Sequence, residues 1–293
     1  MNPFLVGVMG PTASGKTDLA EELAVILDAQ LVNADAFQIY RGMNIGTAKP
    51  ERKSEYRLLD IRNPSEGFGV GEYVSLAEVV LRECWEARRN VVVVGGTGLY
   101  IRALFEEYGE MAAAPDPDLR NRLNEKTLDE LVAELQQADR ASAERVDLRN
   151  RVRVQRALER IYTPEPSVPV RLPPFQKRKY AVVRDPAETV ERITRRVEAM
   201  VKNGWVQEVR QLANAGYAPT DPGLRALGYR AVWQHLNGEV ELNEAVATTI
   251  AETRRYAKRQ RTWLRSEPNL MVLDSGNALV HAKRDLSRYF LEE

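Results

Sequence analysis

The stretch Gly10-Pro11-Thr12-Ala13-Ser14-Gly15-Lys16-Thr17 follows directly on the apolar run Phe4–Met9 near the start of the chain. Two glycines, a lysine and a hydroxyl residue at these spacings, between a predicted strand and a predicted helix, form a phosphate-binding loop. Such a loop lets backbone N–H groups converge on phosphate oxygens, and the helix start adds partial positive charge. Lys16 supplies a full charge, and the Thr17 hydroxyl is suited to hold a phosphate-bound Mg²⁺. The sequence therefore predicts a phosphate site; the alternative is a glycine turn with a purely structural role.

Composition excludes several classes of protein. The 293 residues are 44% hydrophobic and carry no net charge, so a polyanionic partner would have to be attracted by local basic patches. Cys84 is the single cysteine, which excludes a disulfide framework within the chain and a cysteine-rich metal site. No apolar stretch is long enough to span a membrane and no signal peptide is apparent, so we expect a cytoplasmic protein without membrane contact.

Short apolar runs alternate with helical patterns in the first hundred residues. Predicted strands at Phe4–Met9, Gln30–Asn33 and Val91–Val94 are separated by helical patterns at 17–28 and 72–89. This alternation predicts an α/β fold, a P-loop-containing parallel sheet flanked by helices. Later segments continue the pattern, with strands at 180–184 and 270–273, helices at 187–203, 205–215 and 240–265, and a C-terminal helix.

The middle of the chain has a different character. Pro115-Asp116-Pro117 interrupts the alternation, and residues 163–174 are rich in proline. Between them, arginines at 145, 149, 153, 156 and 160 are spaced to share one face of a single helix. We therefore expect a P-loop core at 1–114 and 177–293 and a helical insertion domain at 115–176.

A carboxylate follows the second predicted strand. Asp35 lies in Asn33-Ala34-Asp35, and in a parallel sheet the carboxyl end of a strand beside the phosphate loop faces the bound phosphates. Asp35 is thus a candidate general base, or a ligand of Mg²⁺ through water; the alternative is a helix-capping aspartate.

The third strand ends in Gly95-Gly96-Thr97-Gly98-Leu99-Tyr100, with no acidic residue after the valines. Motor-type nucleotide hydrolases hold Mg²⁺ with an aspartate at that place, so its absence favours a small group-transfer enzyme. Thr97 could donate to a phosphate or accept from a substrate. The alternative is a tight strand-to-helix turn.

Two arginine clusters lie in the C-terminal half. On the predicted helix 187–203, Arg192 and Arg196 border the apolar face and are candidate phosphate ligands, whereas Arg195 stands among glutamates as a solvated ion-pair residue. Further on, basic residues share one helix face opposite Tyr256 and Trp263, which we expect in the core; these residues are Arg254, Lys258, Arg261 and Arg265. The stripe indicates contact with a nucleic-acid backbone, or else an ordinary solvated face.

Together these segments resemble the bacterial tRNA dimethylallyltransferases (tRNA isopentenyltransferases). The resemblance spans nearly the whole chain and keeps the order of the family. It is carried by the phosphate loop, Asn33-Ala34-Asp35 with Gln38-Ile39-Tyr40, Gly42-Met43-Asn44-Ile45-Gly46-Thr47-Ala48-Lys49-Pro50, Gly95–Tyr100, Arg156-Ala157-Leu158-Glu159, Arg225-Ala226-Leu227-Gly228-Tyr229-Arg230 and the run from Tyr256 to Arg265.

The resemblance implies an enzyme that transfers a dimethylallyl group from dimethylallyl diphosphate to the exocyclic amine of the adenosine 3′ to the anticodon, with Mg²⁺. By the same resemblance, the residues Gly10 to Thr17 hold the diphosphate of the donor rather than a nucleoside triphosphate. Asp35 looks like the base, Thr97 like a residue touching both substrates, and Arg196 like a diphosphate ligand, with Lys16 stabilising the leaving group. We expect a monomer.

The resemblance also implies a set of tRNA-contacting residues. They are Asp35, Ala36, Phe37, Gln38, Thr97, Arg120, Val152, Arg153, Val154, Gln155, Arg156, Arg225, Ala226, Leu227, Gly228, Tyr229, Arg230, Lys258, Arg259, Gln260, Arg261, Thr262, Trp263, Leu264 and Arg265. The sequence departs from the family at Ala36, where serine is common, and at Asn150, where aspartate is common.

Two rival functions share part of this pattern. A small-molecule kinase of the shikimate or nucleoside type would have the loop, Asp35 and a glycine-rich third strand, but would need no basic stripes. An RNA-binding P-loop protein without catalysis would not need Asp35 and Thr97 beside the loop.

Overall fold

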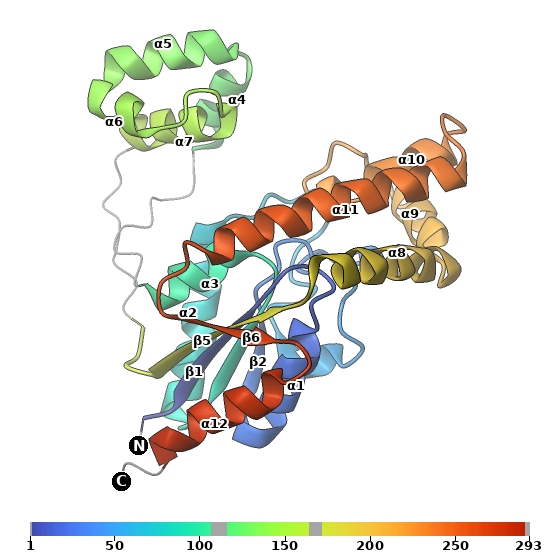
Figure 1. Cartoon of the computed structure of the whole chain (residues 1–293). Coiled ribbons are helices and arrows are strands. Elements are labelled where there is room, and N and C mark those ends of the chain that lie inside the picture. Colours follow the sequence, from blue (N-terminus) through green and yellow to red (C-terminus); the bar gives the residue numbers. More distant parts are fainter. Residues whose placement is uncertain (1, 107–115, 164–171, 291–293) are drawn as a thin grey trace. The chain divides into compact units, whose positions relative to one another are not determined.

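The computed structural model describes residues 2–106, 116–163 and 172–290 and contains one six-stranded, fully parallel sheet (Figure 1). Its strands follow the order β3-β2-β4-β1-β5-β6. They are β1 (Phe4–Met9), β2 (Gln30–Asn33), β3 (Tyr56–Arg57), β4 (Val91–Val94), β5 (Gln176–Val183) and β6 (Leu270–Asp274). The α/β prediction is confirmed, and β1, beside β4, ends in the middle of the sheet where the phosphate loop begins.

Helices cover both faces of this sheet. Helices α1 (Lys16–Leu27) and α12 (Ala278–Phe290) pack on one face, against residues such as Val6, Val92 and Val182. Helices α2 (Val70–Glu86) and α3 (Gly98–Phe105) lie on the other face, where Phe105 presses against Gly7. The four valines of β4 are therefore buried on both sides, as their run predicts.

Four further helices form a separate layer beyond the carboxyl ends of the strands (Figure 1). They are α8 (Pro186–Lys202), α9 (Trp205–Asn214), α10 (Tyr229–Leu236) and α11 (Leu242–Leu264). Their apolar faces share a core with the loop after β2, including Ile39, Tyr40 and Met43, around the fully buried Trp205. This layer supplies one wall of the site described below.

The chain divides into two compact units, one of residues 1–107 and 172–293 and a second of residues 108–171. The expected strand at 180–184 starts earlier, since β5 begins at Gln176, whose amide donates to the carbonyl of Pro3. Within the second unit, buried leucines such as Leu131 and Leu158 form a separate small core. Its helices are α4 (Pro117–Asn124), α5 (Leu128–Ala138), α6 (Arg140–Arg145) and α7 (Arg151–Tyr162).

The expected single helix through 145–160 is wrong. Helix α6 ends at Arg145, and α7 begins only at Arg151, so Arg145 and Arg149 do not share a helical face with the later arginines. The break occurs at Asn150, whose side chain accepts a hydrogen bond from the amide of Arg153 (3.3 Å) and caps α7. Asparagine and aspartate are both good N-cap residues, so asparagine at position 150 is compatible with this helix start.

Among the described residues, no helix combines the length and apolar character needed to cross a bilayer.

Candidate active site

The phosphate loop joins the end of β1 to the start of α1. Gly15 precedes the helix with φ of 94°, a left-handed conformation that a residue with a side chain adopts only with strain. Because of that turn, the first residues of α1, Lys16 and Thr17, border a cavity at the carboxyl edge of the sheet. The N–H groups of a first helical turn have no partner within the helix, so this edge offers donors to an anion.

Two cations are enclosed beside this loop. Burial and the neighbouring Arg196 lower the pKa of Lys16 to about 8, against an opposing effect of Asp35. Burial also lowers the pKa of Arg196, although a guanidinium stays protonated at any physiological pH. Both residues are partly buried and border the cavity. Such a pair is poorly solvated and lacks a strong counter-ion, so the site favours a bound anion.

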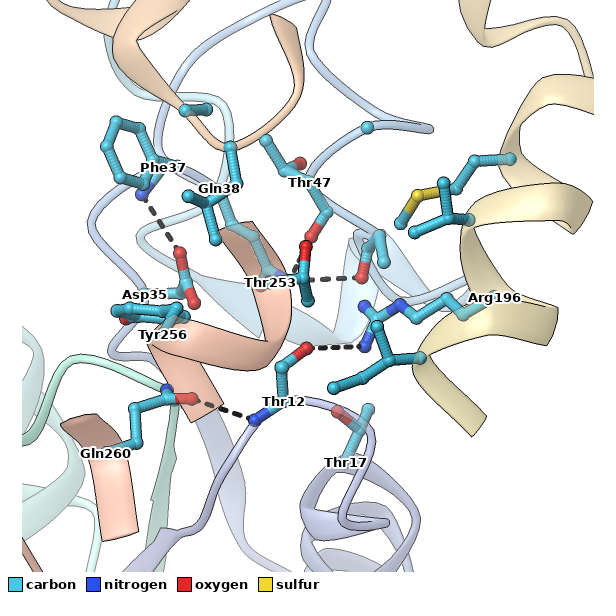
Figure 2. Close-up of a pocket in the computed structure, with 18 of the residues that line it drawn as sticks. Thr12, Thr17, Asp35, Phe37, Gln38, Thr47, Arg196, Thr253, Tyr256 and Gln260 are labelled. Atoms are coloured by element: carbon cyan, nitrogen blue, oxygen red, sulfur yellow. Dashed lines mark hydrogen bonds between the residues drawn. The ribbon is translucent and has the colours of Figure 1, made fainter. Parts of the chain in front are cut away.

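Helices of the C-terminal layer hold the loop in place. Arg196 donates to the Thr12 hydroxyl (3.2 Å), and Arg192 donates to the carbonyl of Ala13 (3.1 Å). From α11, Gln260 accepts from the amide of Thr12 (2.9 Å) and donates to the carbonyl of Gly96 (2.9 Å). Figure 2 shows Thr12 held between Gln260 and Arg196. The loop is thus braced from both sides.

Arg195, on the same helix as Arg196, behaves as its sequence context indicates. It pairs with Glu191 (3.2 Å) on the exposed face of α8.

Asp35 and Thr97 meet where β2 and β4 end. The Asp35 carboxylate accepts a hydrogen bond from the amide of Phe37 (3.0 Å), and the Thr97 hydroxyl accepts from the amide of Ala36 (2.9 Å). The first contact closes a local turn, not a helix cap, and leaves the other oxygen of Asp35 unused by it. Thr97 keeps its hydroxyl hydrogen for a further partner. These two contacts fix the backbone after Asp35, while one carboxylate oxygen of Asp35 and the hydroxyl hydrogen of Thr97 stay available.

A cavity of about 300 Å³ lies between Asp35 and the two cations, and Thr97 is not among the residues that line it (Figure 2). Lys16, Thr17 and Arg196 border it together with Asp35. Aliphatic side chains of α8 and the indole of α9 line another part of it; these are Ile193, Val197, Met200 and Trp205. The cavity therefore combines a cationic region, an apolar region and a carboxylate, which suits a small ligand with an anionic head and an apolar tail.

Aromatic residues stand next to Asp35. Figure 2 shows the ring of Tyr256 beside this carboxylate, and Phe37 also lines the cavity. The expectation that Tyr256 lies in the core is therefore wrong, since it borders the cavity. Its hydroxyl lies 3.4 Å from the carbonyl of Gly96. Sequence periodicity missed it because one turn of α11 faces the cavity where the helix packs on the sheet edge.

A shallow basic groove continues from the cavity, between the loop before α10 and helix α11. Arg225, Ala226 and Leu227 line both the cavity and the groove, as does Arg259, while Arg230 lines the groove alone. Of these predicted tRNA-contacting residues, all but Arg230 are thus brought together with Asp35, Phe37 and Gln38 at the cavity.

Other members of the predicted contact set serve inside the fold. Tyr229 is fully buried and donates to Glu208 (2.7 Å). Arg261 donates to the carbonyl of Arg184 (2.7 Å) and to Thr189 (2.8 Å), which ties α11 to α8 and removes it from the basic stripe. Gln260, the brace described above, is buried and also borders the cavity.

The remaining stripe keeps three exposed cations, Arg254, Lys258 and Arg265, and Thr262 is exposed beside them. Trp263 is partly buried, with the guanidinium of Arg102 4.1 Å from its ring centroid, and Leu264 is also partly buried. The expectation that Trp263 packs inward is thus close to what the structure shows.

The predicted contact residues of the second unit are described within that unit alone. Arg120 and Arg156 both pair with Glu159 (2.9 and 3.0 Å). Burial works to raise the pKa of Glu159, but the hydrogen bonds from the two arginines outweigh it and lower that pKa. Val154 is buried in the unit's core, so its side chain can only support the surface from beneath.

The exposed surface of α7 carries the rest of that set. Arg153 is exposed, Val152 is 76% exposed, and Gln155 donates to the side chain of Asn124 (2.9 Å). An exposed valine next to exposed arginines is a surface that can meet both the bases and the backbone of a nucleic acid.

Sequence reasoning missed the residues that shape the loop after β2. Glu208 and Lys49 have buried charged side chains that bind this loop. Lys49 lies in a segment that carries the family resemblance, whereas the only sequence signal for Glu208 is a charge on the inner face of a predicted helix.

The comparisons with known proteins agree along most of the chain. Residues 38–267 match the family model described as IPP transferase. The chain is 36% identical over 301 residues to tRNA dimethylallyltransferase 1 of Trichlorobacter lovleyi, covering 96% of this chain and 98% of that protein. It is 40% identical over 289 residues to tRNA dimethylallyltransferase of Syntrophobacter fumaroxidans, covering 93% and 84%.

Solved structures show the same relationship. The tRNA isopentenylpyrophosphate transferase of Bacillus halodurans superposes with a TM-score of 0.72 at 32% identity, covering 98% of this chain and 96% of that one. A eukaryotic dimethylallyltransferase acting on tRNA, at 20% identity, shares the fold with a TM-score of 0.82 over 100% of this chain and 80% of that one. By sequence and by fold, the chain belongs to the IPP transferase family.

Proposed function

We propose that this protein transfers a dimethylallyl group from dimethylallyl diphosphate to the exocyclic amine of an adenosine in tRNA, the one 3′ to the anticodon. The names of the relatives support the reaction and the substrate class. The observation that carries the proposal is the composition of the cavity. Enclosed cations, an apolar wall and a carboxylate lie around one space of about 300 Å³.

The donor fits the cavity in one orientation. Its diphosphate would lie against the start of α1, with Lys16 and Arg196, and its five-carbon tail along Val197 and Met200. A nucleoside triphosphate would match the cationic end equally well but would set a polar sugar against this apolar wall. The wall therefore favours the prenyl donor over the substrates of a small-molecule kinase.

The reaction places charge where the site can stabilise it. The adenine nitrogen bonds to the first carbon of the prenyl group while the bond from that carbon to oxygen breaks, and diphosphate leaves with the electron pair. Negative charge grows on the leaving group next to Lys16, Arg196 and the helix N-terminus, which stabilise the transition state more than the bound donor. Enclosure also keeps water from the allylic cation.

Asp35 is suited to remove the proton. The amine becomes acidic only as its new bond to carbon forms, so a carboxylate can accept the proton late in the step. The turn that binds Asp35 to the amide of Phe37 fixes the carboxylate at the cavity, and Thr97 holds the neighbouring amide of Ala36. Position 36 is alanine rather than serine, so its contact with Thr97 is made by its backbone amide.

The residues present also fit a magnesium ion that arrives with the diphosphate. Mg²⁺ prefers oxygen ligands, keeps several waters, and in phosphate sites uses few protein ligands. The Thr17 hydroxyl borders the cavity beside Lys16, and Asp35 could bind through water. When bound, the ion would neutralise part of the leaving group's charge.

The tRNA would reach the cavity along the basic groove. Arg225, Arg230 and Arg259 line that groove and could bind phosphates, while Tyr256 and Phe37 offer rings to an adenine flipped out of its stack. We propose that exposed residues of α7, including Arg153, bind the same RNA. We also propose that the protein acts as a monomer.

Purified protein incubated with dimethylallyl diphosphate, Mg²⁺ and unmodified tRNA should give prenylated adenosine, detected by nucleoside mass spectrometry. Asp35→Asn should lower the transfer rate at least about a hundredfold, since an amide keeps the hydrogen bond to Phe37 but cannot take the proton. Its tRNA affinity should stay within about threefold of the native protein. No mass gain with the native protein, together with ATP-dependent phosphorylation of a small alcohol, would support the kinase instead.

Donor affinity should fall as the pH rises through about 8, because Lys16 loses its proton there in the ligand-free protein. The diphosphate prefers the protonated form, so above that pH its affinity should fall by up to about tenfold per pH unit. Titration calorimetry from pH 7 to 9.5 measures this. Lys16→Arg, which stays protonated, should remove the dependence, and a native affinity that is flat across the range would contradict the assignment.

The exposed stripe should contribute to tRNA binding through charge alone. Replacing Lys258 and Arg265 by alanine should weaken binding and flatten the dependence of log affinity on log salt by about 1 to 2. Arg261→Ala should instead lower the melting temperature, because it loses hydrogen bonds to Arg184 and Thr189. Filter binding at several salt concentrations measures the slope; an unchanged slope in the double variant would make the stripe a solvated face.

A further inference from the structure

A buried carboxylate organises the loop that follows β2. Glu208, on α9, accepts hydrogen bonds from three successive backbone amides, those of Asn44 (2.7 Å), Ile45 (2.7 Å) and Gly46 (3.2 Å). It also accepts from the hydroxyl of Tyr229 (2.7 Å). Four donors on one buried carboxylate hold it firmly, and such charge-assisted bonds are about twice as strong as neutral ones.

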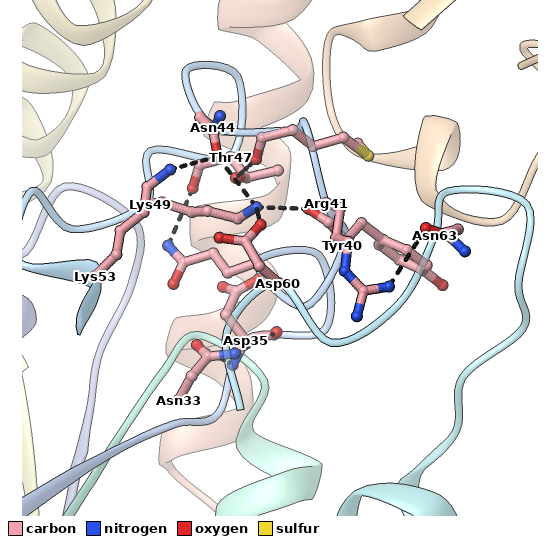
Figure 3. A network of polar contacts seen from close by, with 12 residues as sticks. Asn33, Asp35, Tyr40, Arg41, Asn44, Thr47, Lys49, Lys53, Asp60 and Asn63 are labelled. Carbon is pink, nitrogen blue, oxygen red and sulfur yellow. Dashed lines mark hydrogen bonds and ion pairs between the residues drawn. The ribbon is translucent and has the colours of Figure 1, made fainter. Parts of the chain in front are cut away.

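A buried ammonium fixes the same loop from its other end. Lys49, whose side chain is fully enclosed, donates to the carbonyl of Tyr40 (2.5 Å) and to Asp60 (2.5 Å), and reaches Asn44 (3.4 Å) (Figure 3). Lys53 also donates to Asn44 (2.6 Å). The loop between Asn44 and Lys49 is therefore bound at both ends by charged groups.

This loop packs so closely on the C-terminal layer that it has little freedom to move. A side chain at Gly46 would come within 2.1 Å of the Trp205 indole nitrogen and 2.6 Å of the Tyr229 ring. Gly46 is thus required by close approach, and the two residues after it, Thr47 and Ala48, border the cavity.

The carbonyls of these two residues determine the orientation of Gln38. Its side-chain nitrogen donates to the carbonyl of Thr47 (3.1 Å) and to that of Ala48 (3.1 Å). Both hydrogens of the amide are then used, so the remaining polar atom, Oε1, can only accept. Gln38 borders the cavity three residues after Asp35. The loop thus fixes which end of the Gln38 amide is the nitrogen and leaves the oxygen as the acceptor.

We propose that Glu208 is a positioning residue that, through this loop, presents Oε1 of Gln38 as an acceptor for the second hydrogen of the adenine exocyclic amine. Asp35 takes one hydrogen of that amine and Gln38 binds the other, which orients the nitrogen toward the prenyl carbon. A purine lacking the amine loses the contact. The inference rests on the proposed function for the identity of the base.

The test compares two anticodon stem-loop RNAs, one with adenosine and one with purine riboside at the target position. The native protein should bind the adenosine RNA about tenfold more tightly, the value of a good hydrogen bond. Glu208→Gln puts an amide group against backbone N–H donors and should reduce this ratio to about threefold or less. Glu198→Gln, which changes an exposed carboxylate on α8, should leave the ratio unchanged.

A double-variant comparison separates positioning from general damage. Gln38→Ala should lower the ratio as Glu208→Gln does, and combining the two should lower it no further, because both act through one contact. If Glu208→Gln does not fold, Asn44→Ala, which removes a contact from each of Lys49 and Lys53 but leaves buried Lys49 paired with Asp60, should lower the ratio in the same direction.

An equal loss of affinity for both RNAs in Glu208→Gln would overturn the proposal, and so would additive effects in the double variant. A native ratio near one would overturn it as well. Binding needs no prenyl transfer, so a protein that shows the ratios but yields no product would contradict the proposed function and leave this inference standing.

Discussion

Positive charge enclosed at the end of β1 is the constraint on which the rest of the site depends. Lys16 and Arg196 border one cavity, and within the described residues neither forms an ion pair with a carboxylate. Burial disfavours the charged form of Lys16, so the ligand-free protein keeps this arrangement at a cost in stability. A bound diphosphate removes that cost. The two cations thus make the site ready to bind an anion before the ligand arrives.

The rest of the fold holds these two cations at the cavity and adds the other parts of the site. The parallel sheet brings the ends of β1, β2 and β4 to one edge, which puts Asp35 and Thr97 beside the phosphate loop. The C-terminal helices then add the brace of Gln260 and the apolar wall of α8. Binding, proton transfer and exclusion of water thus come from three parts of the chain that only the fold brings together.

Local patterns predicted local structure well. The bounds of β1 and β4 match the apolar runs, because a strand buried on both faces is continuously apolar. The helix through 145–160 failed because arginine spacing carries no information about the Asn150 cap that interrupts it. Tyr229, Gln260 and Arg261 have side chains able to contact RNA, yet tertiary hydrogen bonds use them inside the fold. Long-range partners, such as Glu208 for the loop after β2, leave no periodic trace in a sequence.

The melting temperature of Lys16→Met, with and without inorganic diphosphate, tests the central claim most directly. The pKa of Lys16 is near 8 when folded and near 10.5 when unfolded, so below pH 8 the folded state bears the full cost of the charge, about 3 kcal/mol. At pH 7 the variant should therefore melt several degrees above the native protein without diphosphate, while diphosphate should raise the melting temperature of the native protein alone. A variant that melts lower than the native protein in both conditions would contradict the account.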